Sequence, residues 1–193
     1  FFAALSISVI LTPLARRVAL KFGFVDKPNN RKKHLMTTPL LGGMAIYIAF
    51  GTVVLAGMLF FDSENRMLAI GWETLCIMVI TGAGLMSIVG LVDDILGLSP
   101  VTKLILHTAA AVLVSFIFIT RGALLSVFLS GSNLAWLTVP LTIIWLVGIT
   151  NSVNLLDHAD GLSAGTCAIA AIFFCILNLL SGNYSIAFIS AAL

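Results

Sequence analysis

The sequence has very little charge. Only 9% of its 193 residues are Asp, Glu, Lys or Arg, while 60% are hydrophobic, and soluble globular domains usually carry roughly 25% charged residues. This composition excludes an ordinary water-soluble domain, because such a domain would have to expose apolar side chains over much of its surface. A lipid bilayer is the solvent that fits the composition.

The sequence also lacks paired cysteine motifs and internal repeats. Its three cysteines, Cys76, Cys167 and Cys175, form no Cys-x-x-Cys pair and lie in apolar stretches, which excludes a disulfide framework or a cysteine metal site. We expect them to be small apolar side chains inside a membrane bundle. Because no repeat or low-complexity tract divides the chain, we predict a single membrane domain over residues 1–193.

Uncharged runs close to the length of a membrane-spanning helix recur along the chain, and a shorter apolar run stands at each end. We predict an all-α, polytopic transmembrane helix bundle that is a fragment with about five complete spans and two partial ones. The complete spans are Leu40–Phe61, Thr74–Val92, Leu104–Thr120, Leu134–Thr150 and Leu162–Leu180, and the partial ones are Phe1–Ala15 and Tyr184–Leu193.

The polar segments between these spans carry unequal charge. If successive spans alternate in direction, segments 21–39, 93–103 and 151–161 lie on one side of the bilayer. That side also holds all Lys and Arg residues except Arg66 and Arg121, and an excess of such residues marks the cytoplasmic side. The aspartates collected on the same side are Asp26, Asp93, Asp94, Asp157 and Asp160. We therefore predict a site that faces the cytoplasm.

Two adjacent carboxylates, Asp93 and Asp94, close one of the predicted spans. They repel each other and lie at the negative end of the helix dipole, so their placement favours a cation. Mg²⁺ suits it, because this ion binds through one or two carboxylates and keeps positions for substrate phosphates. Mn²⁺ is the second choice. A solvated helix end is the other interpretation of the same two residues.

Amide and carboxylate side chains recur between Asn151 and Gly161. On a continuing helix Asn154, Asp157 and His158 would share one face by three- and four-residue spacing. Such a face can hold a diphosphate with its metal and a polar sugar or base. The same groups can instead make hydrogen bonds between helices, with Asp160 as the N-terminal cap of the next span.

The first polar segment is basic, with Lys27, Arg31 and His34 among its cationic residues. Clustered bases at a membrane surface attract the phosphates of a nucleotide or of lipid headgroups. They also serve as a topology anchor, and the cluster alone does not separate these interpretations. Lys103, which opens a later span, can likewise snorkel to the interface or reach a phosphate held at the paired aspartates.

Three motifs, taken in order, resemble the polyprenyl-phosphate N-acetylhexosamine-1-phosphate transferases of glycosyltransferase family 4. They are Val-Asp-Lys-Pro-Asn-x-Arg-Lys-x-His followed by Pro-x-x-Gly-Gly (Val25 to Gly43), Asp-Asp-x-x-x-Leu-Ser-Pro-x-x-Lys (Asp93 to Lys103) and Asn-x-x-Asn-x-x-Asp-x-x-Asp-Gly-Leu (Asn151 to Leu162). The resemblance spans essentially the whole chain. It is closest to the bacterial undecaprenyl-phosphate GlcNAc-1-phosphate transferases.

The resemblance implies Mg²⁺-dependent transfer of a sugar-1-phosphate, GlcNAc-1-phosphate in the closest branch, from a UDP-sugar to undecaprenyl or another polyprenyl phosphate, with release of UMP. It implies a multi-pass enzyme of the plasma (inner) membrane with a cytoplasmic active face. This would be the first membrane step of a cell-envelope polysaccharide such as lipopolysaccharide or teichoic acid. The implied partners are the lipid, the UDP-sugar and the membrane, without nucleic acid, and a homodimer is left open.

By position in the motifs, the resemblance also assigns roles to individual residues. The paired aspartates, Asp93 and Asp94, are predicted to be catalytic and to bind the metal, and Asp157 is predicted to share in metal binding. The residues predicted to bind the substrates are Lys27, Arg31, His34, Lys103, Asn154, Asp157 and Asp160.

The sequence departs from the family pattern in several places. His158 stands where the family usually has Gly, and His107 stands where it often has Gln. No counterpart of the family's Gly-Asp-x-Gly-Ser loop, or of its His-rich loop, follows Leu162. We therefore expect the chain to be the N-terminal part of a longer transferase and to be inactive by itself.

Two alternative functions stand beside this prediction. Transfer of phospho-N-acetylmuramoyl-pentapeptide is the alternative within the family, whose muramoyl branch does not usually carry the Asp-Lys-Pro-Asn form of the first loop. A polytopic transporter is the alternative from another class. Transporters place ionisable groups near the bilayer midplane, whereas the aspartate motifs here lie at the ends of the predicted spans.

Overall fold

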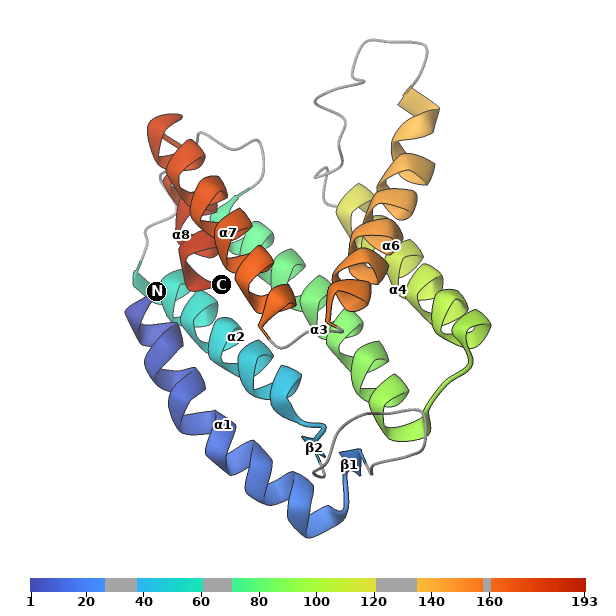
Figure 1. Cartoon of the computed structure of the whole chain (residues 1–193). Helices are drawn as coiled ribbons and strands as arrows, with labels where there is room; N and C mark the ends of the chain where they lie inside the picture. Colours follow the sequence, from blue (N-terminus) through green and yellow to red (C-terminus); the bar gives the residue numbers. More distant parts are fainter. Residues whose placement is uncertain (27–37, 61–70, 121–134, 158–160) are drawn as a thin grey trace.

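The computed structural model describes residues 1–26, 38–60, 71–120, 135–157 and 161–193 (Figure 1). These residues are almost entirely helical, which confirms the predicted all-α bundle. The helices are α1 (Phe2–Phe22), α2 (Gly42–Phe60), α3 (Trp72–Leu96), α4 (Pro100–Thr120), α6 (Thr138–Leu156), α7 (Leu162–Leu180) and α8 (Tyr184–Ala192), with a 3₁₀ turn η1 (Ala135–Leu137) before α6.

Six of the described helices, α1, α2, α3, α4, α6 and α7, are long and apolar enough to cross a membrane. Five of them correspond to the predicted complete spans. Helix α1 corrects the prediction of a partial first span, since it continues through Arg16 and Arg17 to Phe22 and ends at Gly23, whose φ is 76°. Both arginines are exposed, and their long side chains can lie along apolar surface while the charged heads reach water.

The helices pack largely in chain order. Helix α2 lies against α1 and α3, α3 also lies against α4, and α4 lies against α6, while α7 packs mainly on α8 (Figure 1). The apolar core joins α2, the start of α3 and α8, with Val54 and Cys76 completely buried in it. Because α3 is 25 residues long, this core lies at the opposite end of α3 from Asp93.

A short strand pair closes the first polar segment. Strand β1 (Val25–Asp26) pairs antiparallel with β2 (Thr38–Pro39), and the N–H of Leu40 donates to the carbonyl of Phe24 at 3.1 Å. The sequence analysis did not predict these strands, because two residues are too few to show an alternating pattern. The pairing brings the chain from the end of α1 to the start of α2.

The helix that contains Asn151 does not continue to Gly161. This corrects the expectation of one continuing helix over the polar segment 151–161. Helix α6 ends at Leu156 with Asp157 as its C-terminal cap. Helix α7 is preceded by Gly161 in its N-cap position, with a φ of 77°. Glycine adopts this left-handed conformation without the steric cost that other residues meet there. Asp160, the predicted cap, lies outside the described residues, as does His158.

Two glycines of α2 form a matched pair for testing the packing of α2 on α8. A Cβ added at Gly57 would lie 2.5 Å from Cε1 of the Phe188 ring, whereas one added at Gly51 would meet no atom within 4 Å. We expect Gly57→Ala to lower the Tm of the detergent-solubilised protein, because displacing the ring costs about 1–3 kcal/mol. Gly51→Ala should preserve or raise the Tm, since Ala favours a helix more than Gly does. Equal changes in Tm would contradict this packing.

Candidate active site

Lys103 joins two of the three motifs. It lies in the first turn of α4, and its Nζ is 2.6 Å from Oδ2 of Asp93 in the last turn of α3. The same ammonium donates a hydrogen bond to Oδ1 of Asn154, in the last turn of α6, at 2.8 Å. The side chains of Lys103 and Asp93 are each 18% exposed. One partly shielded cation therefore connects the ends of three helices.

The sequence between Asp93 and Lys103 explains why these two side chains meet. Gly97, with a φ of 59°, ends α3 by donating its N–H to the carbonyl of Asp93. Ser99 then caps α4, because its Oγ accepts a hydrogen bond from the N–H of Thr102 at 3.2 Å. Pro100 follows as the first helical residue, the position where its missing N–H costs nothing. The chain thus reverses within a few residues and sets Lys103 beside Asp93.

Asp94 lies in a different environment from Asp93. It lines a cavity of about 150 Å³ between the start of α2 and the end of α3. Neighbouring residues of a helix point about 100° apart, so one carboxylate can contact Lys103 while the next lines this cavity. The other residues around the cavity are Leu40, Gly43, Met44, Ser87, Gly90 and Leu91.

The cavity brings in the end of the first motif. Leu40 and Gly43 belong to its Pro-x-x-Gly-Gly part, and a Cβ added at Gly43 or at Gly90 would meet no atom within 4 Å. All three motifs therefore contribute to one end of the bundle, with Asp93 turned to α4 and α6 and Asp94 turned to α2. The sequence analysis predicted that the motifs converge but did not assign different neighbours to the two aspartates.

A buried histidine lies one helical turn beyond Lys103. The side chain of His107 is 3% exposed, and in the described part of the chain its Nδ1 has no hydrogen-bond partner. The sequence analysis noted His107 only as a departure from a family pattern. Its four-residue spacing from Lys103 was the available sign that both side chains share a face of α4.

The predicted metal ligands are not all brought together. Asp157 is an exposed residue at the C-terminal end of α6. Within the described ranges, no three His, Cys, Asp or Glu side chains are grouped to hold a metal ion. Among the described residues, Asp93, Asp94 and Asp157 are therefore not grouped as one set of metal ligands. The predicted substrate-binding residues Lys27, Arg31, His34 and Asp160 lie outside the described residues.

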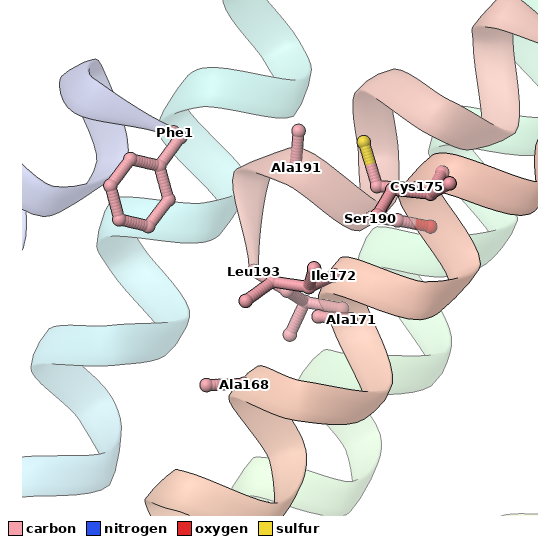
Figure 2. A pocket seen from close by; sticks show the side chains of 9 residues that line it. Phe1, Ala168, Ala171, Ile172, Cys175, Ser190, Ala191 and Leu193 are labelled. Carbon is pink, nitrogen blue, oxygen red and sulfur yellow. The ribbon is translucent and has the colours of Figure 1, made fainter. Parts of the chain in front are cut away.

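A larger pocket elsewhere in the bundle contains none of the motif residues. It has a volume of about 240 Å³ and lies between α7 and α8 beside Phe1. Figure 2 shows its almost wholly apolar lining, in which Cys175 and Ser190 carry the only sulfur and side-chain oxygen among the labelled side chains. Since it offers no charged group, the end of the bundle around Lys103 remains the candidate active site.

Comparison with known proteins identifies the family of the chain. Residues 76–193 match the model of glycosyl transferase family 4. The chain belongs to this family. The matched range includes Asp93, Asp94, Lys103 and Asn154, so the contacts of Lys103 lie within the part that defines the family membership. Together with the six apolar helices, this membership makes the chain part of a multi-pass membrane protein.

Three relatives illustrate the range of named activities. A Bacillus subtilis protein named as a probable undecaprenyl-phosphate N-acetylglucosaminyl 1-phosphate transferase is 34% identical over 95% of this chain and 48% of its own length. A decaprenyl-phosphate N-acetylglucosaminephosphotransferase of Mycolicibacterium smegmatis is 34% identical over 90% of this chain and 43% of its own. A phospho-N-acetylmuramoyl-pentapeptide-transferase of Halalkalibacterium halodurans is 32% identical over 100% of this chain and 60% of its own. The chain thus spans about half the length of these relatives.

A double-mutant cycle tests the contact between Asp93 and Lys103. We expect Lys103→Met to destabilise the protein less when Asp93→Asn is already present, with a coupling of about 0.5 kcal/mol or more, as is usual for residues in contact. Equilibrium unfolding in detergent measures the four free energies. Arg16→Met, which removes an exposed charge on α1, should add independently to Asp93→Asn. Independent addition of Lys103→Met as well would contradict the ion pair.

Proposed function

We propose that this chain is part of an enzyme that transfers GlcNAc-1-phosphate from UDP-GlcNAc to undecaprenyl phosphate or another polyprenyl phosphate, with release of UMP. The observation that carries the proposal is the position of Lys103 between Asp93 of the second motif and Asn154 of the third. Phosphoryl transfer between two anions depends chiefly on positioning and on charge stabilisation. A cation and paired carboxylates at the end of apolar helices can supply both.

The proposed reaction is a phosphoryl transfer at the sugar-bearing phosphorus of the nucleotide. An oxygen of the lipid phosphate forms a bond to this phosphorus, and the bond from it to the bridging oxygen of the diphosphate breaks. UMP leaves with that oxygen, and the product is a polyprenyl diphosphate that carries the sugar. A phosphate monoester has a second pKa near 6 and is mostly dianionic at neutral pH. The acceptor therefore needs little help from a general base.

Mg²⁺ is the ion that we propose for Asp93 and Asp94, with Mn²⁺ as the second choice. A hard cation of this kind binds through one or two carboxylates and completes its shell with water and substrate phosphates, so even one of these aspartates would suffice as its protein ligand, although the two have different neighbours in this structure. Asp93 already attracts one cation, the ammonium of Lys103. The ion, when bound, would neutralise charge on the diphosphate.

Lys103 and Asn154 are proposed to bind the nucleotide sugar. An ammonium has three N–H donors, and two of those of Lys103 point to Asp93 and Asn154, which leaves one for a phosphate oxygen. Oδ1 of Asn154 accepts from Lys103, and the residue is exposed, so we propose that its amide nitrogen serves as a donor to the substrate. Lys103 thereby orients Asn154 as well as supplying charge.

The remaining motif residues are proposed to complete the donor site. Lys27, Arg31 and His34 would supply positive charge for the phosphates, and Asp157 and Asp160 would contact the sugar or the nucleoside. Because positive charge concentrates on the same polar segments, we propose that this end of the bundle faces the cytoplasm at the plasma (inner) membrane. A UDP-sugar dissolved in the cytoplasm would then meet a lipid phosphate at headgroup depth.

Transfer of phospho-N-acetylmuramoyl-pentapeptide is the second candidate function. The 32% identity to the Halalkalibacterium halodurans enzyme, over 100% of this chain, supports it. Both candidates use the same acceptor chemistry and differ in the sugar of the donor. The polytopic transporter is no longer favoured, because the relatives are named transferases.

The experiment follows UMP release by the full-length protein in bilayers that contain undecaprenyl phosphate, with UDP-GlcNAc and Mg²⁺. We expect release only when lipid, nucleotide sugar and metal are all present. Asp93→Asn and Asp94→Asn should each lower the rate about 100-fold or more, the usual effect of removing a group that stabilises charge in the transition state.

The matched control is Glu73→Gln, which neutralises the carboxylate in the first turn of the same helix, α3, at its other end. This variant should keep the wild-type rate. Release from UDP-N-acetylmuramoyl-pentapeptide alone would move the assignment to the second candidate. An equal loss in all three variants, or no release from any UDP-sugar, would contradict the proposed function.

A further inference from the structure

His107 is a buried polar side chain that the proposed reaction does not use. It is 3% exposed, and among the described residues its Nδ1 finds no hydrogen-bond partner. Leaving such an atom buried and unpaired destabilises the folded protein. Most buried polar atoms in proteins have a partner, either a protein group or an ordered water, so the nitrogen of His107 calls for an explanation.

The position of His107 relates it to Lys103. The two residues are four apart on α4, and so they lie on one face of the helix, one turn from each other. Side chains on a helix lean toward its N-terminus, which tilts the imidazole toward the turn that carries Lys103. Helix α4 packs on α3 and on α6. His107 therefore lies one turn further along the same face of α4 that carries Lys103.

Asn151 occupies the matching position on α6. It precedes Asn154 by three residues and shares its face. Because Lys103 near the start of α4 contacts Asn154 near the end of α6, one further turn into the bundle leads to His107 along α4 and to Asn151 along α6. The side chain of Asn151 is half-buried, and its Nδ2 donates to the carbonyl of Val147 at 2.8 Å. Its Oδ1 is the end of the amide that can accept a hydrogen bond.

We propose that His107 is a positioning residue, whose Nδ1 is linked to Oδ1 of Asn151 by one buried water. A water both donates and accepts, and buried waters typically satisfy polar groups of this kind. The link forms a second polar layer that fixes α4 against α6. The link thereby fixes the position of Lys103 between Asp93 and Asn154. The effect of this link on catalysis rests on the proposed function.

The fixing of α4 matters because the two partners of Lys103 belong to different helices. A shift of α4 along α6 would lengthen the hydrogen bond to Asn154, and the ammonium would move away from the proposed diphosphate site. A directional hydrogen bond would add to the register that apolar packing of the two helices provides. Small displacements of a catalytic group can lower the rate strongly.

The test compares His107→Met with His107→Gln in the full-length protein, assayed by UMP release from UDP-GlcNAc in bilayers. The two side chains have similar length and flexibility, and only Gln can hydrogen-bond. We expect His107→Met to lower kcat about 10-fold, as is typical when a residue that orients an active-site group is lost, with little change in KM. His107→Gln should restore most of the rate.

Ser115 provides a control for the general effect of removing a buried polar side chain from α4. It is 1% exposed, and within the described residues its Oγ also has no partner, but it lies eight residues beyond His107. Ser115→Ala should leave kcat unchanged. If Ser115→Ala lowers kcat as much as His107→Met does, or if His107→Met keeps the wild-type kcat, the positioning role is overturned.

A second measurement does not depend on enzymatic activity. In the cycle of His107→Met and Asn151→Leu, each single substitution should lower the Tm, and the double variant should have a Tm no lower than the less stable single one, because both lose the same link. A histidine that only fills space predicts the opposite. His107→Met would then preserve or raise the Tm by removing an unpaired polar atom, and the two effects would add.

These readouts separate the two proposals. An absence of UMP release from the wild-type protein with any UDP-sugar would refute the proposed function and leave the link between His107 and Asn151 to the Tm cycle. Additive Tm effects in an active enzyme would refute the link and leave the proposed function standing.

Discussion

The sharing of one ammonium between two helices is the interaction on which the polar end of this bundle depends. Lys103 approaches Asp93 at 2.6 Å and Asn154 at 2.8 Å, and these partners come from α3 and α6. The distances can be kept only if the ends of three helices stay within the length of a lysine side chain. The turn at Gly97 and Ser99 enforces this spacing for α3 and α4, because a left-handed glycine stops one helix and a serine cap starts the next. Between α4 and α6, the hydrogen bond from Lys103 to Asn154 helps to fix the register of the two helices.

The apolar core and the candidate active site therefore lie at opposite ends of the bundle. At one end, apolar packing among α2, α3 and α8 surrounds Trp72 and Cys76 and buries them. At the other end the same helix, α3, carries two carboxylates that face different neighbours, Asp93 toward Lys103 and Asp94 toward the cavity beside α2. In the proposed reaction this division would let the substrates meet at headgroup depth while most of the apolar surface lies in the bilayer.

The sequence predicted the parts of this fold that hydrophobic length controls. The spans from α2 to α7 follow from uncharged runs, and the meeting of the motifs follows from alternating direction. The first span was underestimated because a charge count treats arginine as a stop, although Arg16 can snorkel from within a helix. The break after Leu156 depends on the backbone of Gly161, whose φ of 77° a side-chain pattern does not reveal. The partners of Lys103 were not predictable by spacing, since Asn154 is 51 residues away.

The central claim is that Lys103 organises the site for a diphosphate, and a structure of the full-length protein with UDP-GlcNAc and Mg²⁺ bound tests it most directly. The account predicts that Nζ of Lys103 is hydrogen-bonded to an oxygen of the diphosphate while Oδ1 of Asn154 remains its partner. A nucleotide sugar whose diphosphate lies away from Lys103, with the contact between Lys103 and Asp93 unchanged, would contradict the account.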